Sequence, residues 1–413
     1  MGFFSRIGIW LRSEADAVPL ALVLLVSPLT PLATLRQLRE LGEYSYLPDP
    51  EELLVREPDA LGEKMREVLR AALLAQRAGR RSVLEQELDE LMARTGMELE
   101  VADYHLSQLF QLASLFTTVI PVTLASVVLF TNPGAVAPLL LACAAAAAIL
   151  GAVAGLGVFP RELALPTPPL KSFTAMVLLP LTYLALVALG MVGVGIECPV
   201  LLSTALGTIP LSLTQLSWRR RVLATYREAR ELVRKAGMAS YNVFAALGIK
   251  DPAYLLSGRW VGVARAAATS LYMLCLYGGR GLEAALRRLE AYVGRYLDYL
   301  LRIRGKTRAM LLYGLLEAAV VAASYAILMA TLRYLSSLPG GAVGVRIPSQ
   351  AELDAMMEWL DAVLAVDSLA LALATAAARE GQPLLFGSYL PALAAVTWAG
   401  FTLGLRAAPL LFS

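Results

Sequence analysis

Long apolar runs alternate with charged stretches along this chain. From residue 106 to residue 160 the only ionisable side chain is Cys143, and Glu197 is the only charged residue in the apolar run 173–217. About 20 apolar residues cross a bilayer as one helix, so the run 173–217 must hold two spans that meet near Glu197. Further apolar runs cover residues 110–130, 135–158, 309–332, 362–378 and 384–405. The pattern predicts an all-α, polytopic helical membrane protein with about seven to eight spans.

The alternation divides the chain into five segments. They are an amino-terminal amphipathic segment with an uncertain first span (1–34), a helical lobe (35–109), four spans (110–217), a second helical lobe (218–308) and three spans with an acidic external loop (309–413). The run 17–34 is interrupted by Pro19, Pro28 and Pro31 and is barely long enough to span. An interfacial or re-entrant segment is the alternative at this position.

Charge is concentrated in the two lobes, although 58% of the 413 residues are hydrophobic and the mean hydropathy is +0.62. Residues 36–103 carry 10 basic and 16 acidic side chains, and residues 219–308 carry 18 basic and 6 acidic side chains. The first lobe is therefore acidic and the second is basic. Opposite charges allow the lobes to contact each other or two faces of a partner.

Basic residues next to spans predict the orientation in the membrane. The second lobe begins and ends with basic clusters, which the positive-inside rule places in the cytoplasm. Four spans separate the lobes, so the first lobe lies on the same side. We therefore expect a multi-pass protein of the cell membrane with both lobes cytoplasmic and the loop 336–361 outside. The boundary residues are Arg219, Arg220, Arg221, Arg304, Lys306 and Arg308.

A helix with one apolar face is predicted at the end of the second lobe. Apolar residues recur at steps of three and four, at Leu282, Leu286, Leu289, Val293, Tyr296, Leu300 and Ile303. This stripe is expected to pack against other helices, while the opposite face is charged and rich in arginine. Gly278, Gly279 and Gly281 precede the helix without the strand or Lys-Ser/Thr of a phosphate loop, so we interpret them as a helix-starting turn.

The two lobes show an internal repeat. Gly79-Arg80 and Gly279-Arg280 lie 200 residues apart, and each pair precedes an amphipathic helix and then a span. The helix after Gly79 is acidic, with Glu85, Glu87, Asp89 and Glu90.

No motif in the sequence indicates catalysis. Cys143, Cys198 and Cys275 are isolated, His105 is the only histidine, and no Walker loop, GxSxG elbow or dinucleotide fingerprint occurs. We therefore expect no catalytic, metal or cofactor site, and a function other than that of an enzyme.

Residues 278–316, GGRGLEAALRRLEAYVGRYLDYLLRIRGKTRAMLLYGLL, resemble the type II secretion system F domain. The matching features are a glycine turn, Leu-Glu-x-Ala-Leu, an amphipathic helix rich in Arg and Tyr, a charged juxtamembrane patch and an immediate span. The number of spans is closer to archaellum and archaeal-pilus members of this family. The resemblance implies a non-enzymatic platform protein that binds a hexameric secretion ATPase through its cytoplasmic lobes and helps to move pilin-like subunits from the membrane into a filament. A homodimer is left open.

The arginine face has two interpretations. The arginines of the second lobe can contact anionic lipid headgroups, as basic residues near spans commonly do, or bind the ATPase. ATPase binding is expected mainly at the residues that lie away from the span boundary, Arg280, Arg287, Arg288 and Arg295. Nucleic acid is not expected as a partner, because the aromatic residues lie on the apolar stripe.

Two acidic residues fall within predicted spans, Glu317 and Asp367. We expect Glu317 at or below the inner interface and Asp367 near the outer end of its span, because a carboxylate at mid-bilayer is unfavourable by about 2.5–3.5 kcal/mol. These residues and the repeated halves also suggest an alternative function, a membrane transporter or channel with cytoplasmic regulatory lobes.

Overall fold

The structure is a computed structural model that describes residues 3–55, 58, 60–131, 133–189, 197–238, 243–278, 281–337 and 348–411. Within these ranges the regular elements are all helices and no strand occurs, which confirms the predicted all-helical class. The chain forms two compact units. Unit 1 comprises residues 1–101, 160–166 and 219–303, and unit 2 comprises residues 102–159, 167–218 and 304–413.

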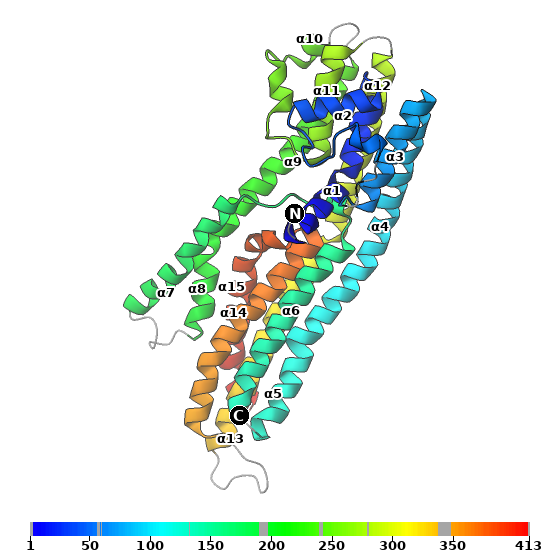
Figure 1. The fold of residues 1–413 in the computed structure, drawn as a ribbon. Coiled ribbons are helices and arrows are strands. Elements are labelled where there is room, and N and C mark those ends of the chain that lie inside the picture. The colour runs from blue at the N-terminus through cyan, green and yellow to red at the C-terminus, as the bar shows by residue number, and fades with distance from the viewer. Residues whose placement is uncertain are drawn as a thin grey trace. The chain divides into compact units, whose positions relative to one another are not determined.

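Unit 2 contains most of the apolar helices. The long helices α6, α13, α14 and α15 pack together, with α6 against α14 and α13 against α15 (Figure 1). The elements of unit 2 are the end of α4 (Ser82–Ser114), a π-helical turn η2 (Leu115–Val119), α5 (Ile120–Thr131), η3 (Pro133–Ala135), α6 (Val136–Val158), η5 (Leu170–Val177), α7 (Leu178–Ala188), α8 (Pro199–Gly207), the start of α9 (Ile209–Gly237), α13 (Arg308–Ser337), α14 (Gln350–Glu380), η7 (Pro383–Ser388), α15 (Leu390–Ala407) and η8 (Ala408–Leu411).

Close packing in unit 2 depends on small residues. A Cβ atom at Gly400 would lie 2.7 Å from the carbonyl oxygen of Ala319, and one at Gly404 would lie 2.8 Å from the Cβ atom of Ala326. Glycines spaced four residues apart thus let α15 approach the backbone of α13, as small residues do between membrane helices.

Five described helices are long and apolar enough to cross a membrane, or six if a helix pair bent by 117° counts as one span. This agrees with a helical membrane protein. The expected total of about seven to eight spans stays a prediction.

Unit 1 collects the charged helices from three separate parts of the sequence. Its elements are α1 (Phe3–Val26), α2 (Pro31–Glu40), η1 (Glu52–Leu54), α3 (Glu63–Ala78), most of α4, η4 (Arg161–Leu163), the end of α9, α10 (Val243–Leu247), η6 (Pro252–Leu256), α11 (Gly262–Tyr277) and α12 (Leu282–Lys306). Segments 35–101 and 219–303, which the sequence assigned to two lobes, thus belong to one compact unit.

Helix α1 lies at the core of unit 1. It packs against α3 and α11, and every residue from Ala17 to Val26 other than Pro19 is at most 3% exposed. The apolar character of the uncertain first span is therefore satisfied by protein contacts within unit 1.

Helix α12 has the predicted buried stripe. Leu286, Leu289, Val293, Tyr296, Leu300 and Ile303 are buried. The glycine turn before it is confirmed where it is described: Gly278 caps α11, and Gly281, at φ +93°, precedes the first residue of α12. Gly279 and Arg280 lie outside the described residues.

Candidate functional site

The α4 and α12 helices pack in parallel within unit 1. Arg288 pairs with Glu85 at 3.0 Å, and Arg295 pairs with Asp89 at 3.1 Å. One turn further along α12, the Tyr299 hydroxyl lies 3.0 Å from the Cβ position of Gly96 on α4. The contact positions increase along both helices, so the helices run in the same direction. The acidic helix of the first lobe thus neutralises part of the arginine face of the second.

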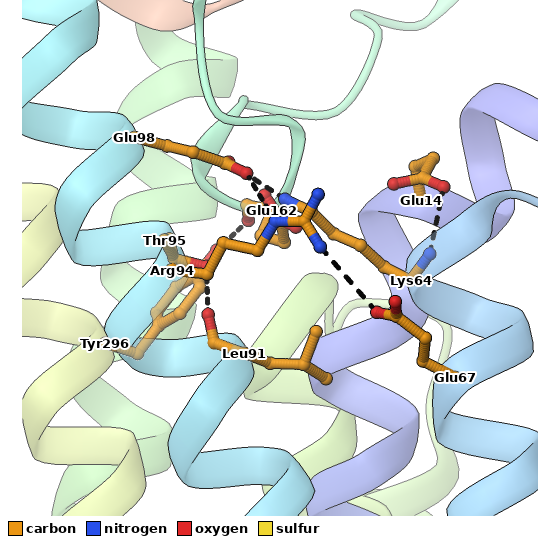
Figure 2. A network of polar contacts seen from close by, with 9 residues as sticks. All are labelled: Glu14, Lys64, Glu67, Leu91, Arg94, Thr95, Glu98, Glu162 and Tyr296. Atoms are coloured by element: carbon orange, nitrogen blue, oxygen red, sulfur yellow. Dashed lines mark hydrogen bonds and ion pairs between the residues drawn. The ribbon is translucent and has the colours of Figure 1, made fainter.

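A buried polar network joins α3, α4 and α12 to the connector at residues 160–166 (Figure 2). The Lys64 ammonium donates to Glu162 Oε1 at 2.6 Å and to Glu98 Oε2 at 2.8 Å. The Tyr296 hydroxyl donates to the carbonyl oxygen of Glu162. Arg94 adds ion pairs to Glu98 at 3.4 Å and to Glu67 at 3.8 Å. The network anchors the connector inside a charged unit.

Charge neutralisation explains why Lys64 can be buried. Burial by itself would lower the pKa of Lys64, but the carboxylates of Glu162 and Glu98 outweigh it, and the pKa is raised. Glu162 has a fully buried side chain, and its Oε2 atom has no hydrogen-bond partner among the described residues. The buried negative charge of Glu162 is therefore stabilised mainly by the positive charge of Lys64.

A second charged cluster fastens α1 inside unit 1. Arg265 of α11 forms ion pairs with Asp16 at 3.0 Å and with Glu43 at 3.4 Å. The Tyr46 hydroxyl also donates to Asp16, at 3.0 Å. Burial would lower the pKa of Arg265, but nearby Tyr44, Asp16 and Glu43 raise it. These contacts fix the polar part of α1 just before its buried apolar run.

The structure separates the four arginines that the sequence grouped as a partner surface. Arg288 and Arg295 pair with α4 and are about half exposed. Arg287 is 77% exposed, and its ion pair among the described residues is with Glu283 of its own helix, at 2.5 Å. Arg280 lies outside the described residues. Arg287 is thus the most accessible of the three described arginines.

The boundary residues lie where the chain passes between the two units. Unit 2 ends at Trp218 and resumes at Arg304, while Arg220, Arg221 and Arg308 are exposed. Arg304 forms an ion pair with the buried Glu380 at 2.8 Å, and the Tyr389 hydroxyl donates to the same carboxylate at 2.8 Å. The side chain of Lys306 is not among those that the structure describes.

Helix α9 has an exposed basic face that the sequence analysis treated only as a topology signal. One side of the helix buries Val222, Tyr226, Ala229 and Val233. No ion pair joins the exposed basic residues to an acidic side chain within the described ranges. We call these residues the α9 basic face: Arg220, Arg221, Arg227, Arg230, Arg234 and Lys235. The signal in the sequence was the seven-residue spacing of Arg220, Arg227 and Arg234, which places them on one side of a helix.

The acidic residues of unit 2 lie closer together than the sequence analysis expected. Glu317 on α13 accepts a hydrogen bond from Thr117 at 2.8 Å and acts electrostatically on Asp367 of α14. We predicted the two carboxyl groups at opposite ends of their spans. Asp367 is instead central in its helix, because α14 begins at Gln350 rather than at residue 362.

Comparison of the chain with protein-family models, with curated proteins and with solved structures found no match.

Proposed function

We propose that this chain is an integral membrane platform protein for assembly of a type IV pilus-like filament or for type II-like secretion. In this role it couples a hexameric secretion ATPase in the cytoplasm to pilin-like subunits in the membrane. The proposal assigns unit 1 to the cytoplasm and unit 2 to the bilayer. It is supported by the charge distribution: 52 of the 69 Asp, Glu, Lys and Arg residues fall in the ranges of unit 1, which is the smaller unit.

The proposal also includes a duplication of one helical hairpin. Helices α3 and α11 both have 16 residues and begin 199 residues apart, at Glu63 and Gly262. Helices α4 and α12 begin 200 residues apart, at Ser82 and Leu282. The parallel contact of α4 with α12 supports two copies that pack against each other, as the F-domain resemblance of the second copy implies.

The observation that carries the proposal is the α9 basic face. This face presents six exposed cations on one helix, and Glu231 is the one exposed acidic residue among them. In the described structure Glu231 forms no ion pair with these cations. Such a face fits an acidic protein surface. Anionic lipid would satisfy Arg220 and Arg221, which follow the apolar part of α9 directly.

Lipid does not reach the far end of this face. If the apolar part of α9 lies in the bilayer, the helix rise places Arg234 about 24 Å beyond Trp218. Headgroups extend only about 5–8 Å beyond the hydrocarbon core, and a helix tilt of about 40° shortens the distance by only a quarter. Charges are screened over about 8 Å at physiological ionic strength. Arg234 and Lys235 are therefore assigned to the ATPase, and Arg227, about 14 Å beyond Trp218, lies on the same side of the helix as Arg234.

The test is direct binding of the cell's secretion ATPase to the full-length chain in lipid nanodiscs. Arg227→Glu with Arg234→Glu is expected to weaken binding by about tenfold or more and to reduce its salt dependence. The matched control is Arg77→Glu, which reverses an exposed charge on α3. Unchanged binding by the double variant, or equal loss in the control, would argue against the α9 basic face as the docking surface.

A transporter or channel is the second candidate, because Glu317 and Asp367 lie close together among apolar helices. The discriminating measurement is solute or ion flux in proteoliposomes that contain the purified chain alone. Flux that depends on Asp367 would favour the transporter, and no flux together with ATPase binding would favour the platform.

A further inference from the structure

We propose that Glu317 and Asp367 form a proton-binding carboxyl pair inside unit 2. This inference does not depend on the platform function, since it concerns the apolar helices α13 and α14 and not the charged helices of unit 1. The ligand is a proton, which is bound by one of two neighbouring carboxyl groups in an apolar environment that disfavours their charges.

The first argument is the depth of the pair. Glu317 lies thirteen residues after Arg304, and Asp367 lies thirteen residues before Glu380. Because Arg304 and Glu380 form an ion pair, the helix rise places both carboxyl groups about 20 Å from it. The hydrocarbon core of a bilayer is about 30 Å thick. If the Arg304–Glu380 pair lies at the edge of this core, a carboxyl group at this distance lies well inside the apolar region.

The second argument is the surroundings of Asp367. Three titratable groups interact electrostatically with Asp367: Glu317 and Tyr325 of α13 and Cys143 of α6. The next residue, Ser368, donates a hydrogen bond from its hydroxyl to Thr397 of α15 at 3.0 Å. In the described structure no lysine, arginine or histidine is paired with Asp367. An ionised Asp367 would therefore lack a countercharge and would have a second carboxyl group as its neighbour.

The third argument is unused hydrogen-bonding capacity directed into the same place. Asp367 is 4% exposed and Tyr325 is 2% exposed. Neither Asp367 Oδ2 nor the Tyr325 hydroxyl has a hydrogen-bond partner among the described residues. Buried polar atoms without partners are rare in native proteins. A proton on Asp367 removes the charge that the carboxylate would otherwise hold without a partner.

Asp361 shows the contrasting arrangement on the same helix. Its two carboxylate oxygens accept the backbone N–H groups of Val200 at 2.7 Å and Leu201 at 2.9 Å, at the start of α8. Two N–H donors at a helix amino terminus stabilise an ionised carboxylate. Asp361 is thus an internal control, being buried like Asp367 but provided with partners.

The proton also matters for packing. Helices α13 and α14 contact each other, and release of the proton would place a second negative charge between them. We therefore expect the contact to be tighter when the pair is protonated.

The experiment uses the full-length chain in lipid nanodiscs and a hydrophobic carbodiimide, which reacts with protonated carboxyl groups. Peptide mass spectrometry should find the label on Asp367 or Glu317 at neutral pH and not on Asp361, with labelling that falls as the pH rises. In Glu317→Gln, the pH at which labelling of Asp367 is lost should be lower than in the unmodified chain by about one unit or more, because the neighbouring carboxylate is gone. Labelling of Asp361 to the same extent, or an unchanged pH profile in Glu317→Gln, would overturn the pair.

Infrared spectra of the same samples provide a readout that needs no reagent to enter the protein. Compared with the unmodified chain, the band of protonated carboxyl groups should be weaker in Asp367→Asn. The band should be unchanged in Asp361→Asn. Absence of both the label and this band at neutral pH would show that the carboxyl groups are ionised and would overturn the proposal.

Discussion

Arg288 of α12 forms an ion pair with Glu85 of α4 at 3.0 Å, so an arginine that looked available for a partner is engaged within the chain. Arg295 and Asp89 repeat this contact two turns further along α12. The pairs join the first and the second lobe of the sequence into one unit. The α9 basic face and Arg287 are among the exposed cations that a partner can reach.

The internal role of Arg288 predicts rescue by charge exchange. Arg288→Glu should weaken the α4–α12 contact by about 0.2–1 kcal/mol, as is usual for a half-exposed pair, and Glu85→Arg in the same chain should restore it. Thermal unfolding of unit 1 in the full-length chain gives the energies. ATPase binding should be unchanged in both variants, because docking is assigned to the α9 basic face. Binding that is lost in Arg288→Glu and stays lost in the doubly exchanged chain would show that Arg288 contacts the partner itself.

The buried Lys64–Glu162 pair predicts a larger effect. Lys64→Met leaves Glu162 buried without its cation, and such a loss destabilises by about 3–5 kcal/mol. Adding Glu162→Leu should recover much of this, because the unpaired charge is then gone. Denaturant unfolding measures the free energy of unfolding of the single and the double variant. The control is Arg36→Met, which removes the exposed ion pair of Arg36 with Glu51, and there a loss of about 0–1 kcal/mol is expected. Equal effects at the two sites would contradict the buried network.

The same pair predicts a dependence on alkaline pH. The pKa of Lys64 is raised in the folded chain, so its contribution is fully present below the unfolded lysine pKa of about 10.4. The contribution is lost as the pH rises through the higher folded value. Stability measured between about pH 9 and pH 11 should fall less steeply in Lys64→Met than in the unmodified chain. Identical slopes would show that Lys64 has no shifted titration.

The glycines of α15 predict a packing effect in unit 2. Gly400→Ala with Gly404→Ala places Cβ atoms within 3 Å of α13, so the helices must separate, with an expected loss of about 1–3 kcal/mol. Gly157→Ala is the matched control, because a Cβ atom there meets nothing within 4 Å. Unfolding in detergent micelles compares the two. A stable double variant would show that α13 and α15 tolerate a wider spacing.

Patterns local in the sequence predicted the structure well where one helix face decides the outcome. The stripe of α12 and the turn at Gly281 follow from spacing and from backbone freedom alone. Hydropathy could not predict that α1 packs inside unit 1, because a buried core helix and a membrane span are apolar over a similar length. The apolar run alone also began at residue 362, whereas α14 begins at Gln350, since the acidic first turns of α14 resemble a loop in composition. Asp367 was therefore expected near one end of its helix, although it lies near the middle.

Contacts between distant residues had no local signal. Lys64 and Glu162 are 98 residues apart, and Glu162 stood in a proline-rich connector without a helical pattern. Whether Arg288 and Arg295 face α4 or a partner depends on how the lobes pack, which charge totals alone do not determine. The spacing of Arg220, Arg227 and Arg234 was visible, but the same residues also satisfied the positive-inside rule.

The most direct test of the platform function is site-specific crosslinking in living cells. A photo-reactive amino acid at position 227, on the α9 basic face, should give a covalent product with the secretion ATPase. The same amino acid at position 77, exposed on α3, should give none. A missing product from position 227, or equal products from both positions, would contradict docking of the ATPase on α9.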